Sequence, residues 1–490
     1  MDNLLRGIQS QTIDLCTLDL ISSLINMQFY FYYGNDATDS EFMLTELLRE
    51  SFYTTLLDFP ALVGRLEVDG SQRAKIVVDK DKLNLPEFLV SQSSVHFRDL
   101  QASKFSWDAL PDGVATVGPV NTADSSGDMK AANVHVVRLR DNSGVILFVS
   151  VAHYVFDGTG YGEFINRWAE LCRWMCRYNA TNEPPAYYCS YERSALFESL
   201  PEGRKALDEL TLEMITATGP LVRWLAWLSP KTRARLLGAT ISLRSMEGHI
   251  FHIPASRLAG LRTSVQEYLS SGERLSDNDI LTALLTMTVA QSVAECKQDS
   301  TSASYLSSLT SYLFPSRYAP DASFYTLVVV DMRSRLEGLR TARYTGNAAI
   351  TTCLVSSMES MTSNDNEQSL TLIAKSVRQL VNGVDSQYIG QIVDTFHKDT
   401  TCFMGQLSFS IAKRPLVLSN MSRFSMYRID FGHGTPTWVS PIRTSSPNFS
   451  QILPAHPSTG GYLVHMSMAE QTMAKILRNK FWMNTADMVY

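Results

Sequence analysis

Apolar residues recur along the chain at two spacings, and each spacing predicts one kind of element. Between positions 44 and 57 they lie three or four residues apart, which predicts a helix ended by Pro60. Runs of β-branched or alternating apolar residues predict strands. Further strands are expected at residues 61–68, 324–332, 407–411, 427–431 and 462–468, and further helices at 277–294 and 468–479.

The clearest local signal is a pair of β-rich runs. Residues 133–139 and 145–152 are joined by the turn-forming sequence Asp-Asn-Ser-Gly, which predicts a β-hairpin. A glycine-rich stretch then breaks the strand pattern, and an amphipathic helix is expected at 163–178. His153 is therefore expected at the end of a strand, just before a turn and a helix.

The order of these elements predicts an α/β fold with mixed sheets. Strands and helices alternate without strict βαβ units, which disfavours a doubly wound parallel sheet. A chain of 490 residues is long enough for two domains, and the proline-punctuated stretch 179–205 is the best candidate for a linker. We expect an N-terminal domain at 1–180, a crossover linker at 181–215 and a C-terminal domain at 216–490.

Composition and charge narrow the class of protein. Hydrophobic residues make up 45% of the chain and the net charge is −6, which is ordinary for a globular protein and does not favour nucleic-acid binding. No secretory leader and no uninterrupted apolar span is evident, so we expect a cytoplasmic protein without a membrane span. The seven cysteines are scattered without a CxxC pair, which predicts reduced thiols and no zinc site. No feature marks a symmetric interface, and a monomer is expected.

His153 is the first candidate for chemistry. An imidazole with a pKa near 6.5 can be neutral and basic at pH 7, and a strand end can present it to a cleft. Asp157, four residues later, could orient the imidazole or pair with an arginine, and Gly158 permits a tight turn. The alternative is a structural histidine in the core and an aspartate that caps the next helix.

Other catalytic and binding schemes find less support. The sequence has no GxSxG elbow, no Walker A motif and no GxGxxG after a strand. The segment 158–162 lacks the lysine of a phosphate loop, so a simple turn is expected there. His249 and His252 lie three residues apart without a nearby pair of carboxylates, which disfavours a metal site.

Several segments match known motifs in order. Residues 153–158 read HYVFDG, and residues 430–436 read DFGHGTP. They resemble the HxxxDG and DFGWG motifs of the BAHD acyltransferases of plants and fungi. Weaker similarities to the family follow its order and extend over nearly the whole chain, at residues 15–19, 59–66, 330–335 and 344–347.

The resemblance implies a fold and an activity. Members have two domains similar to chloramphenicol acetyltransferase, with mixed sheets flanked by helices and an active-site channel between the domains. The HxxxD histidine acts as general base for transfer of an acyl group from coenzyme A (CoA). His153 would take that role, with acyl-CoA and a small acceptor as the partners and acetyl-CoA as the expected donor. No permanently bound cofactor and no metal are expected.

The resemblance also assigns supporting roles. Asp157 would point away from the channel and pair with an arginine, for which Arg333 is the best match and Arg335 the alternative. Ser419 and Asn420 match a small polar pair that could stabilise the oxyanion or position the substrate; an ordinary turn is the other interpretation.

The second motif would be structural, through Asp430, Gly432 and Gly434. His433 stands where the family has tryptophan, and Thr435 where it has a basic residue, which weakens any link between this loop and the CoA phosphates. These departures are typical of a divergent, fungal branch.

We therefore predict an acyltransferase that transfers groups other than aminoacyl groups, acting on a hydroxyl of a small natural product such as an alkaloid, terpenoid or polyketide. One alternative is an N-acyltransferase or a condensation-type enzyme of the same superfamily, although Ala152 stands where the condensation motif has a first histidine. Another is a catalytically silent relative that binds small molecules. The sequence does not identify which residues contact CoA. It also does not identify the acceptor or the acyl donor.

Overall fold

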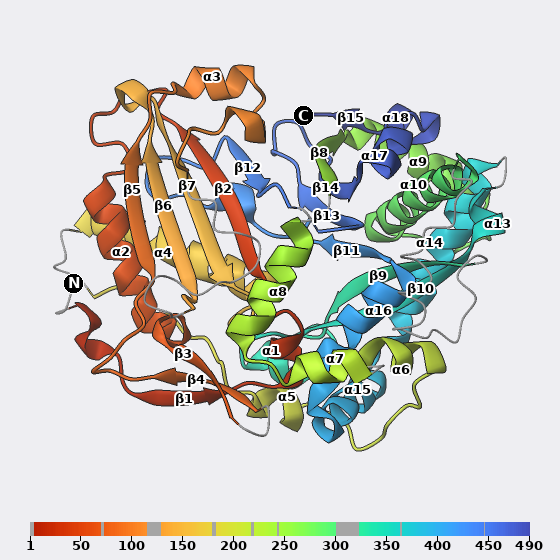
Figure 1. Ribbon diagram of the computed structural model, residues 1–490. Helices are drawn as coiled ribbons and strands as arrows, with labels where there is room; N and C mark the ends of the chain where they lie inside the picture. Colours follow the sequence, from red (N-terminus) through yellow and green to blue (C-terminus); the bar gives the residue numbers. More distant parts are fainter. Residues whose placement is uncertain are drawn as a thin grey trace.

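A computed structural model describes most of the chain. The described residues are 4–69, 73–114, 129–178, 183–216, 220–242, 245–299, 323–362, 365–444 and 446–490. Within them the chain forms three sheets flanked by helices (Figure 1). The predicted α/β class with mixed sheets is confirmed.

The first large sheet lies on the left of Figure 1 and carries the predicted hairpin. Its five strands, in spatial order, are β12 (Trp438–Pro441), β2 (Asn26–Gly34), β7 (Gly144–Ala152), β6 (Ala132–Arg138) and β5 (Glu87–Gln92). All neighbours are antiparallel except β5 and β6. The edge strand β12 comes from the far C-terminal part of the chain, so both halves of the sequence build this sheet.

The second large sheet lies on the right of the same view. Its strands, in order, are β10 (Ala349–Ser357), β9 (Ser323–Asp331), β11 (Leu416–Asn420), β13 (Phe449–Pro454), β14 (Tyr462–Ala469), β8 (Met246–Ile253) and β15 (Asp487–Met488). The strand β11 runs parallel to both of its neighbours, and the other pairs are antiparallel. A small antiparallel sheet contains β1 (Gln11–Asp14), β4 (Ala74–Val78) and β3 (Arg65–Val68).

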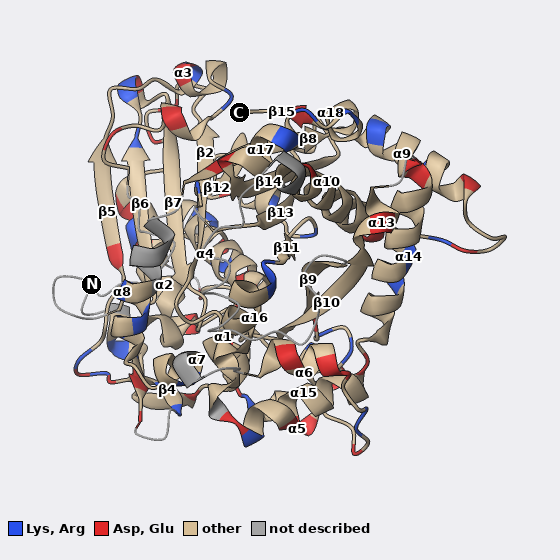
Figure 2. Ribbon diagram, turned by 45° about the vertical axis from the view of Figure 1, so that its right-hand side comes forward, with Lys and Arg blue, Asp and Glu red and all other residues tan. Residues whose placement is uncertain are grey.

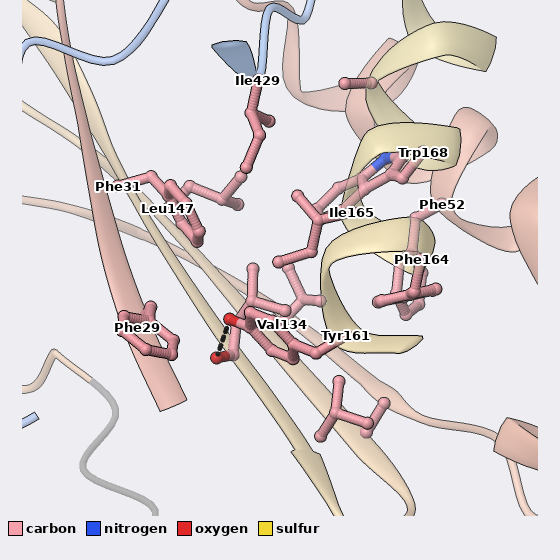
Figure 3. Packing of buried hydrophobic residues seen from close by; sticks show 14 of the residues in the cluster. Phe29, Phe31, Phe52, Val134, Leu147, Tyr161, Phe164, Ile165, Trp168 and Ile429 are labelled. Carbon is pink, nitrogen blue, oxygen red and sulfur yellow. Dashed lines mark hydrogen bonds between the residues drawn. The ribbon is translucent and has the colours of Figure 1, made fainter. Parts of the chain in front are cut away.

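Two helices cover one face of the first sheet. They are α2 (Thr45–Asp58) and α4 (Gly158–Tyr178), which pack against each other. Figure 3 shows the core between them and the strands, where rings from β2 and from both helices meet. The Tyr161 hydroxyl donates to the Val149 carbonyl at 3.2 Å, which joins α4 to β7 directly.

Of the remaining helices, α3 packs on the first sheet, and the others lie around the second sheet or connect the halves. In chain order they are α1 (Thr17–Ile21), α3 (Phe97–Ala102), α5 (Ser194–Glu198), α6 (Glu209–Ile215), α7 (Pro220–Ala226), α8 (Pro230–Ser242), α9 (Ala255–Glu267), α10 (Asp277–Asp299), α12 (Glu337–Thr341), α13 (Met358–Met361), α14 (Asn366–Gly383), α15 (Ser386–Lys398), α16 (Gly405–Lys413), α17 (Glu470–Ile476) and α18 (Lys480–Thr485). Short 3-10 turns are η1 (Leu4–Gly7), η2 (Pro60–Val63), η3 (Trp107–Ala109), η4 (Arg140–Asn142), η5 (Thr400–Met404) and η6 (Met426–Arg428). The buried helix α10 packs on α9, α14 and α17 in a second core.

Most of the predicted elements agree with this structure. The hairpin, the helices at 44–57, 277–294 and 468–479, and the strands at 324–332 and 462–468 are confirmed within a few residues. The helix α4 begins at Gly158, five residues before its predicted start, because the Asp157 carboxylate accepts from the backbone N–H groups of its first turn.

Three predicted strands need correction. Residues 61–68 begin with the turn η2, so only Arg65 onward is extended. Residues 407–411 lie in α16, where Gly405, Ser408 and Phe409 are buried at helical spacing against the rest of the protein. Residues 427–431 form η6 and a turn, because their alternating apolar side chains fill the first core without any strand partner among the described residues.

The predicted division into domains stays a prediction, as does the channel between them. None of the seven cysteines, all of which lie in the described part of the chain, forms a disulfide bond. No helix in the described part of the chain is long and apolar enough to cross a membrane.

Candidate active site

His153 directly follows β7 and opens the turn that leads into α4. Its backbone is held from two sides: the N–H donates to the Ile25 carbonyl at 3.0 Å, and the carbonyl accepts from Asn347 Nδ2 at 2.9 Å. The side chain is partly exposed, and its Nδ1 is buried without a hydrogen-bond partner. With Nδ1 closed off, Nε2 is the ring nitrogen that remains for contact with a ligand.

The surroundings keep this imidazole neutral. Burial lowers the pKa of His153 below its ordinary value of 6.5, because a charged ring would lose its hydration. Asp157 and Asn347 oppose this effect but do not reverse it. At pH 7 the ring therefore carries an unprotonated nitrogen that can accept a proton.

Asp157 is buried, and all of its hydrogen bonds go to groups other than the His153 ring. Arg333 donates through Nη1 to Oδ2 at 2.8 Å and through Nη2 to Oδ1 at 3.0 Å. The backbone N–H groups of Ala348, Thr159 and Gly160 also donate to the carboxylate, at 2.9, 3.1 and 3.2 Å. Burial alone would raise the pKa of Asp157, but Arg333 and these N–H donors lower it below its usual value.

Arg333, not Arg335, lies against Asp157. Arg333 also donates to the carbonyls of Tyr344 and Gly346, at 2.8 and 2.6 Å, so its guanidinium crosses between the start of α4 and the segment before β10. Arg335 instead donates to the carbonyls of Val381 and Val384 at the C-terminal end of α14. The Asp157–Arg333 pair therefore connects the turn after β7, in the first sheet, to the segment after β9, in the second sheet.

A second buried ion pair supports the same turn from the other side. Asp19 is fully buried and receives Arg193 Nη2 at 2.7 Å and Arg193 Nε at 3.0 Å. It also accepts at 3.0 Å from Asn347 Nδ2, the group that donates to the His153 carbonyl. Asp19, Arg193 and Asn347 were not among the predicted site residues. Asp19 and Asn347 lie in segments that resemble the family, whereas nothing in the sequence marks Arg193.

Ser419 and Asn420 end β11, close to the turn after His153. Asn420 is already engaged: its Nδ2 donates to Asn278 Oδ1 at 2.7 Å, and its Oδ1 accepts from Ser422 N–H at 2.9 Å. The partly exposed Ser419 hydroxyl has no hydrogen bond to any described residue. The next residue, Met421, packs against Gly158.

Gly158 allows a close approach of the side chains that follow β11. A Cβ at this position would lie 2.4 Å from the Phe424 ring and 3.3 Å from the Met421 methyl group. A Cβ so close to the Phe424 ring would force that ring to move, and the Met421 methyl group would have to shift by a few tenths of an ångström.

The DFGHG loop lies at the other end of α4. Asp430 Oδ1 accepts from the N–H groups of Gly432 and Gly434 at 2.7 and 3.0 Å, and both glycines have positive φ, +109° and +97°. Phe431 is buried, with its ring 4.9 Å from that of Trp168 in α4, and Arg173 donates to the Asp430 carbonyl. About 15 helical residues, roughly 22 Å, separate Arg173 from Gly158, so this loop does not lie beside His153.

Residues weighed for other roles occupy structural positions. His249 contacts Glu247 and His252 contacts the Gly460 carbonyl, each at 2.8 Å, and no group of three potential metal ligands occurs among the described residues. A cavity of about 750 Å³ lies between α1, β4 and α15 and is lined in part by Arg193. His153 is not among its lining residues.

Comparisons with known proteins identify the family of the chain. The profile of the Transferase family matches residues 6–192 and 273–481. The chain belongs to this family. It is an acyltransferase of the BAHD type, as its motifs predicted.

Individual relatives are distant in sequence. The chain is 24% identical over 352 residues to the O-acetyltransferase astG of Aspergillus oryzae, covering 64% of this chain and 68% of that protein. It is 21% identical over 464 residues to phenolic glucoside malonyltransferase 2 of Arabidopsis thaliana, which covers 91% of this chain and 88% of that protein. The crystal structure of F. sporotrichioides TRI101 complexed with coenzyme A and T-2 has a TM-score of 0.67 at 15% identity, covering 98% of this chain and all of that one. The structural likeness shows that this chain shares the fold of TRI101.

Proposed function

We propose that this protein transfers an acyl group, most simply acetyl, from CoA to a hydroxyl of a small natural product, with His153 as general base. The observation that carries the proposal is a neutral imidazole with a reachable Nε2, held by its backbone between two buried ion pairs. The O-acetyltransferase among the relatives and the neighbouring structure complexed with coenzyme A support the donor and the acceptor group.

The proposed step balances without a covalent enzyme intermediate. His153 Nε2 takes the proton of the acceptor hydroxyl while its oxygen attacks the thioester carbonyl. The tetrahedral oxyanion then collapses, the carbon–sulfur bond breaks, and the imidazolium protonates the departing CoA thiolate. The product is an ester, and the imidazole is neutral again.

Supporting residues have separate roles in this proposal. Asp157 and Arg333 position the turn, since the carboxylate is saturated by other donors and cannot relay the proton from the imidazole. Ser419 is the better candidate for an oxyanion donor because its hydroxyl is uncommitted among the described residues, whereas the Asn420 amide is bonded to Asn278. Cytoplasmic location, a monomer and the predicted domain boundaries belong to the same proposal.

The first test is thiol release from acetyl-CoA with a panel of hydroxylated natural products. We expect release that depends on the acceptor and falls by about 10²- to 10⁴-fold in kcat for His153→Ala. The matched control is His397→Ala, an exposed histidine outside the turn, which should keep wild-type activity. Because protonation removes the base, kcat/KM should fall in acid with a midpoint below 6.5, the direction of the His153 pKa.

Other outcomes would favour the alternatives. Thiol release with amines but not with alcohols would indicate an N-acyltransferase. Acyl transfer only from carrier-bound thioesters would indicate a condensation-type enzyme. Binding of CoA by calorimetry without any turnover, from folded protein, would indicate the silent relative. Full activity in His153→Ala would exclude the mechanism proposed here.

A further inference from the structure

Residues 214–246 differ from the rest of the chain in charge. This segment contains five lysine or arginine residues and no aspartate or glutamate, in a chain with a net charge of −6. It also lies between the two stretches that match the family profile, so the shared family sequence does not account for it. The segment folds largely as the helices α7 and α8.

The short helix α7 has one buried side and one side in water. Val222 and Ala226 are fully buried against Phe403 and Met404, and this contact anchors the helix to the protein. Trp224 and Trp227, by contrast, have 57% and 59% of their surface exposed. Two tryptophans held in water beside an already satisfied packing face are unusual for a soluble surface.

The next helix adds cations beside the tryptophans. Lys231, Arg235 and Leu236 are exposed on α8, while Arg233 is buried with its guanidinium 4.6 Å from the centre of the Phe403 ring. Figure 2 shows blue positions along α8, and in Figure 1 both helices lie on the near side of the molecule. On α7, Arg223 pairs with Asp399 at 3.0 Å, so that cation is balanced in part.

We propose that the exposed side of α7 and α8 docks on an anionic membrane surface. Tryptophan rings favour the boundary between lipid headgroups and acyl chains, and lysine and arginine side chains bind anionic headgroups. The docking is peripheral, because no helix in the described residues can span a bilayer. The negative charge of the chain as a whole repels such a surface, so contact is local and fixes the orientation of the molecule.

A second copy of the chain fits the same surface less well. In a twofold dimer the same patch meets itself, which would bring the cations of both copies together. An anionic lipid surface neutralises those cations and covers the tryptophans at once.

Sedimentation with lipid vesicles tests the proposal. The full chain is mixed with vesicles of phosphatidylcholine alone or of phosphatidylcholine with phosphatidylserine, at low and at high salt. We expect binding to the second kind only, reduced by salt and weakened at least about tenfold by Lys231→Glu with Arg235→Glu. Trp224→Ala with Trp227→Ala should also abolish binding and remove a blue shift of the fluorescence that vesicles produce in the wild type.

Matched variants distinguish binding through this site from non-specific binding to vesicles. Tyr188→Ala removes an aromatic ring that is 72% exposed elsewhere, and Arg340→Glu reverses an exposed charge on α12. Both should bind vesicles like the wild type. Failure of the wild type to bind, equal binding to both vesicle types, or a self-association that the tryptophan variants abolish would each overturn the proposal.

Discussion

The two strongest sequence motifs of this protein lie at opposite ends of one helix and are stabilised in different ways. At the start of α4, the Asp157 carboxylate is neutralised by Arg333, a residue 176 positions away in the sequence. At the far end, Asp430 is satisfied by the backbone of its own loop, and a buried phenylalanine attaches that loop to the helix.

The two motifs also differ in what they leave available for contact with a ligand. Long-range contacts hold the backbone at His153, while the ring nitrogen Nδ1 has no hydrogen-bond partner. In the DFGHG loop no reactive group is left uncommitted in that way, because Phe431 is buried and His433 contacts Asp39 at 3.2 Å. A similar strength of sequence signal therefore corresponds to two different physical roles.

The largest effect on stability is expected from the Asp157–Arg333 pair. Breaking a buried ion pair leaves the other charge uncompensated, so Arg333→Met should lower the free energy of unfolding by about 3–5 kcal/mol. Asp157→Asn should cost a similar amount, and the double variant should cost less than the sum. Urea denaturation at pH 7 measures all three. Because the pKa of Asp157 is lowered in the folded state from its ordinary value of 3.8, this stabilisation is complete well above that ordinary value and is lost as the pH falls through the lowered one.

Kinetics distinguish a positioning role from a proton relay. The charge of Asp157 raises the pKa of His153, so Asp157→Asn should move the acid limb of kcat/KM to lower pH and leave the folded fraction active. A variant as stable as the wild type but as inactive as His153→Ala would contradict the positioning role. The start of α4 would then contain a second residue that takes part in the reaction.

An intermediate effect is expected at the DFGHG loop. Gly432→Ala places a side chain at φ +109° and 3.3 Å from the Cys176 sulfur, which should cost about 1–3 kcal/mol of unfolding free energy. Gly434→Ala has the same kind of strain at φ +97° but open space around it, so its cost should be smaller. Both variants should keep kcat/KM per folded molecule, because the loop is far from His153.

Gly162→Ala is the matched control for these substitutions. Gly162 lies in α4, and a Cβ there would meet no atom within 4 Å. Replacing glycine by alanine in a helix should stabilise the protein by about 0.5–1 kcal/mol. Loss of activity in folded Gly432→Ala, with none in Gly162→Ala, would show that the loop contributes to the reaction.

The sequence predicted those parts of this arrangement that depend on local pattern. The hairpin and the place of His153 at a strand end follow from β-rich runs and a turn. The Asp157–Arg333 pair came from family resemblance, since no periodicity relates residues 176 positions apart.

Other features depend on tertiary contacts that a single sequence does not reveal. Residues 407–411 alternate like a strand but are buried at helical spacing, because α6 and its neighbours surround that segment. Arg193 lies in a stretch that was predicted as linker, and its partner Asp19 is 174 residues away. The contact between Arg193 and Asp19, and its link to the His153 turn through Asn347, exist only in the folded chain.

The smallest effect is expected at His433, where this chain departs from the family motif. The imidazole contacts Asp39 at 3.2 Å and lies 5.4 Å from the Phe42 ring, with 19% and 40% of the two polar side chains exposed. Water and salt screen such a pair, so His433→Leu, Asp39→Asn and the double variant should give a coupling energy of about 0.2–1 kcal/mol that falls with added salt. A larger, salt-independent coupling would mean that His433 holds the loop as strongly as the buried pair holds the other end of α4. A value near zero would leave Phe431 and the two glycines as the residues that fix the loop, and would explain why histidine can replace tryptophan here without loss of the fold.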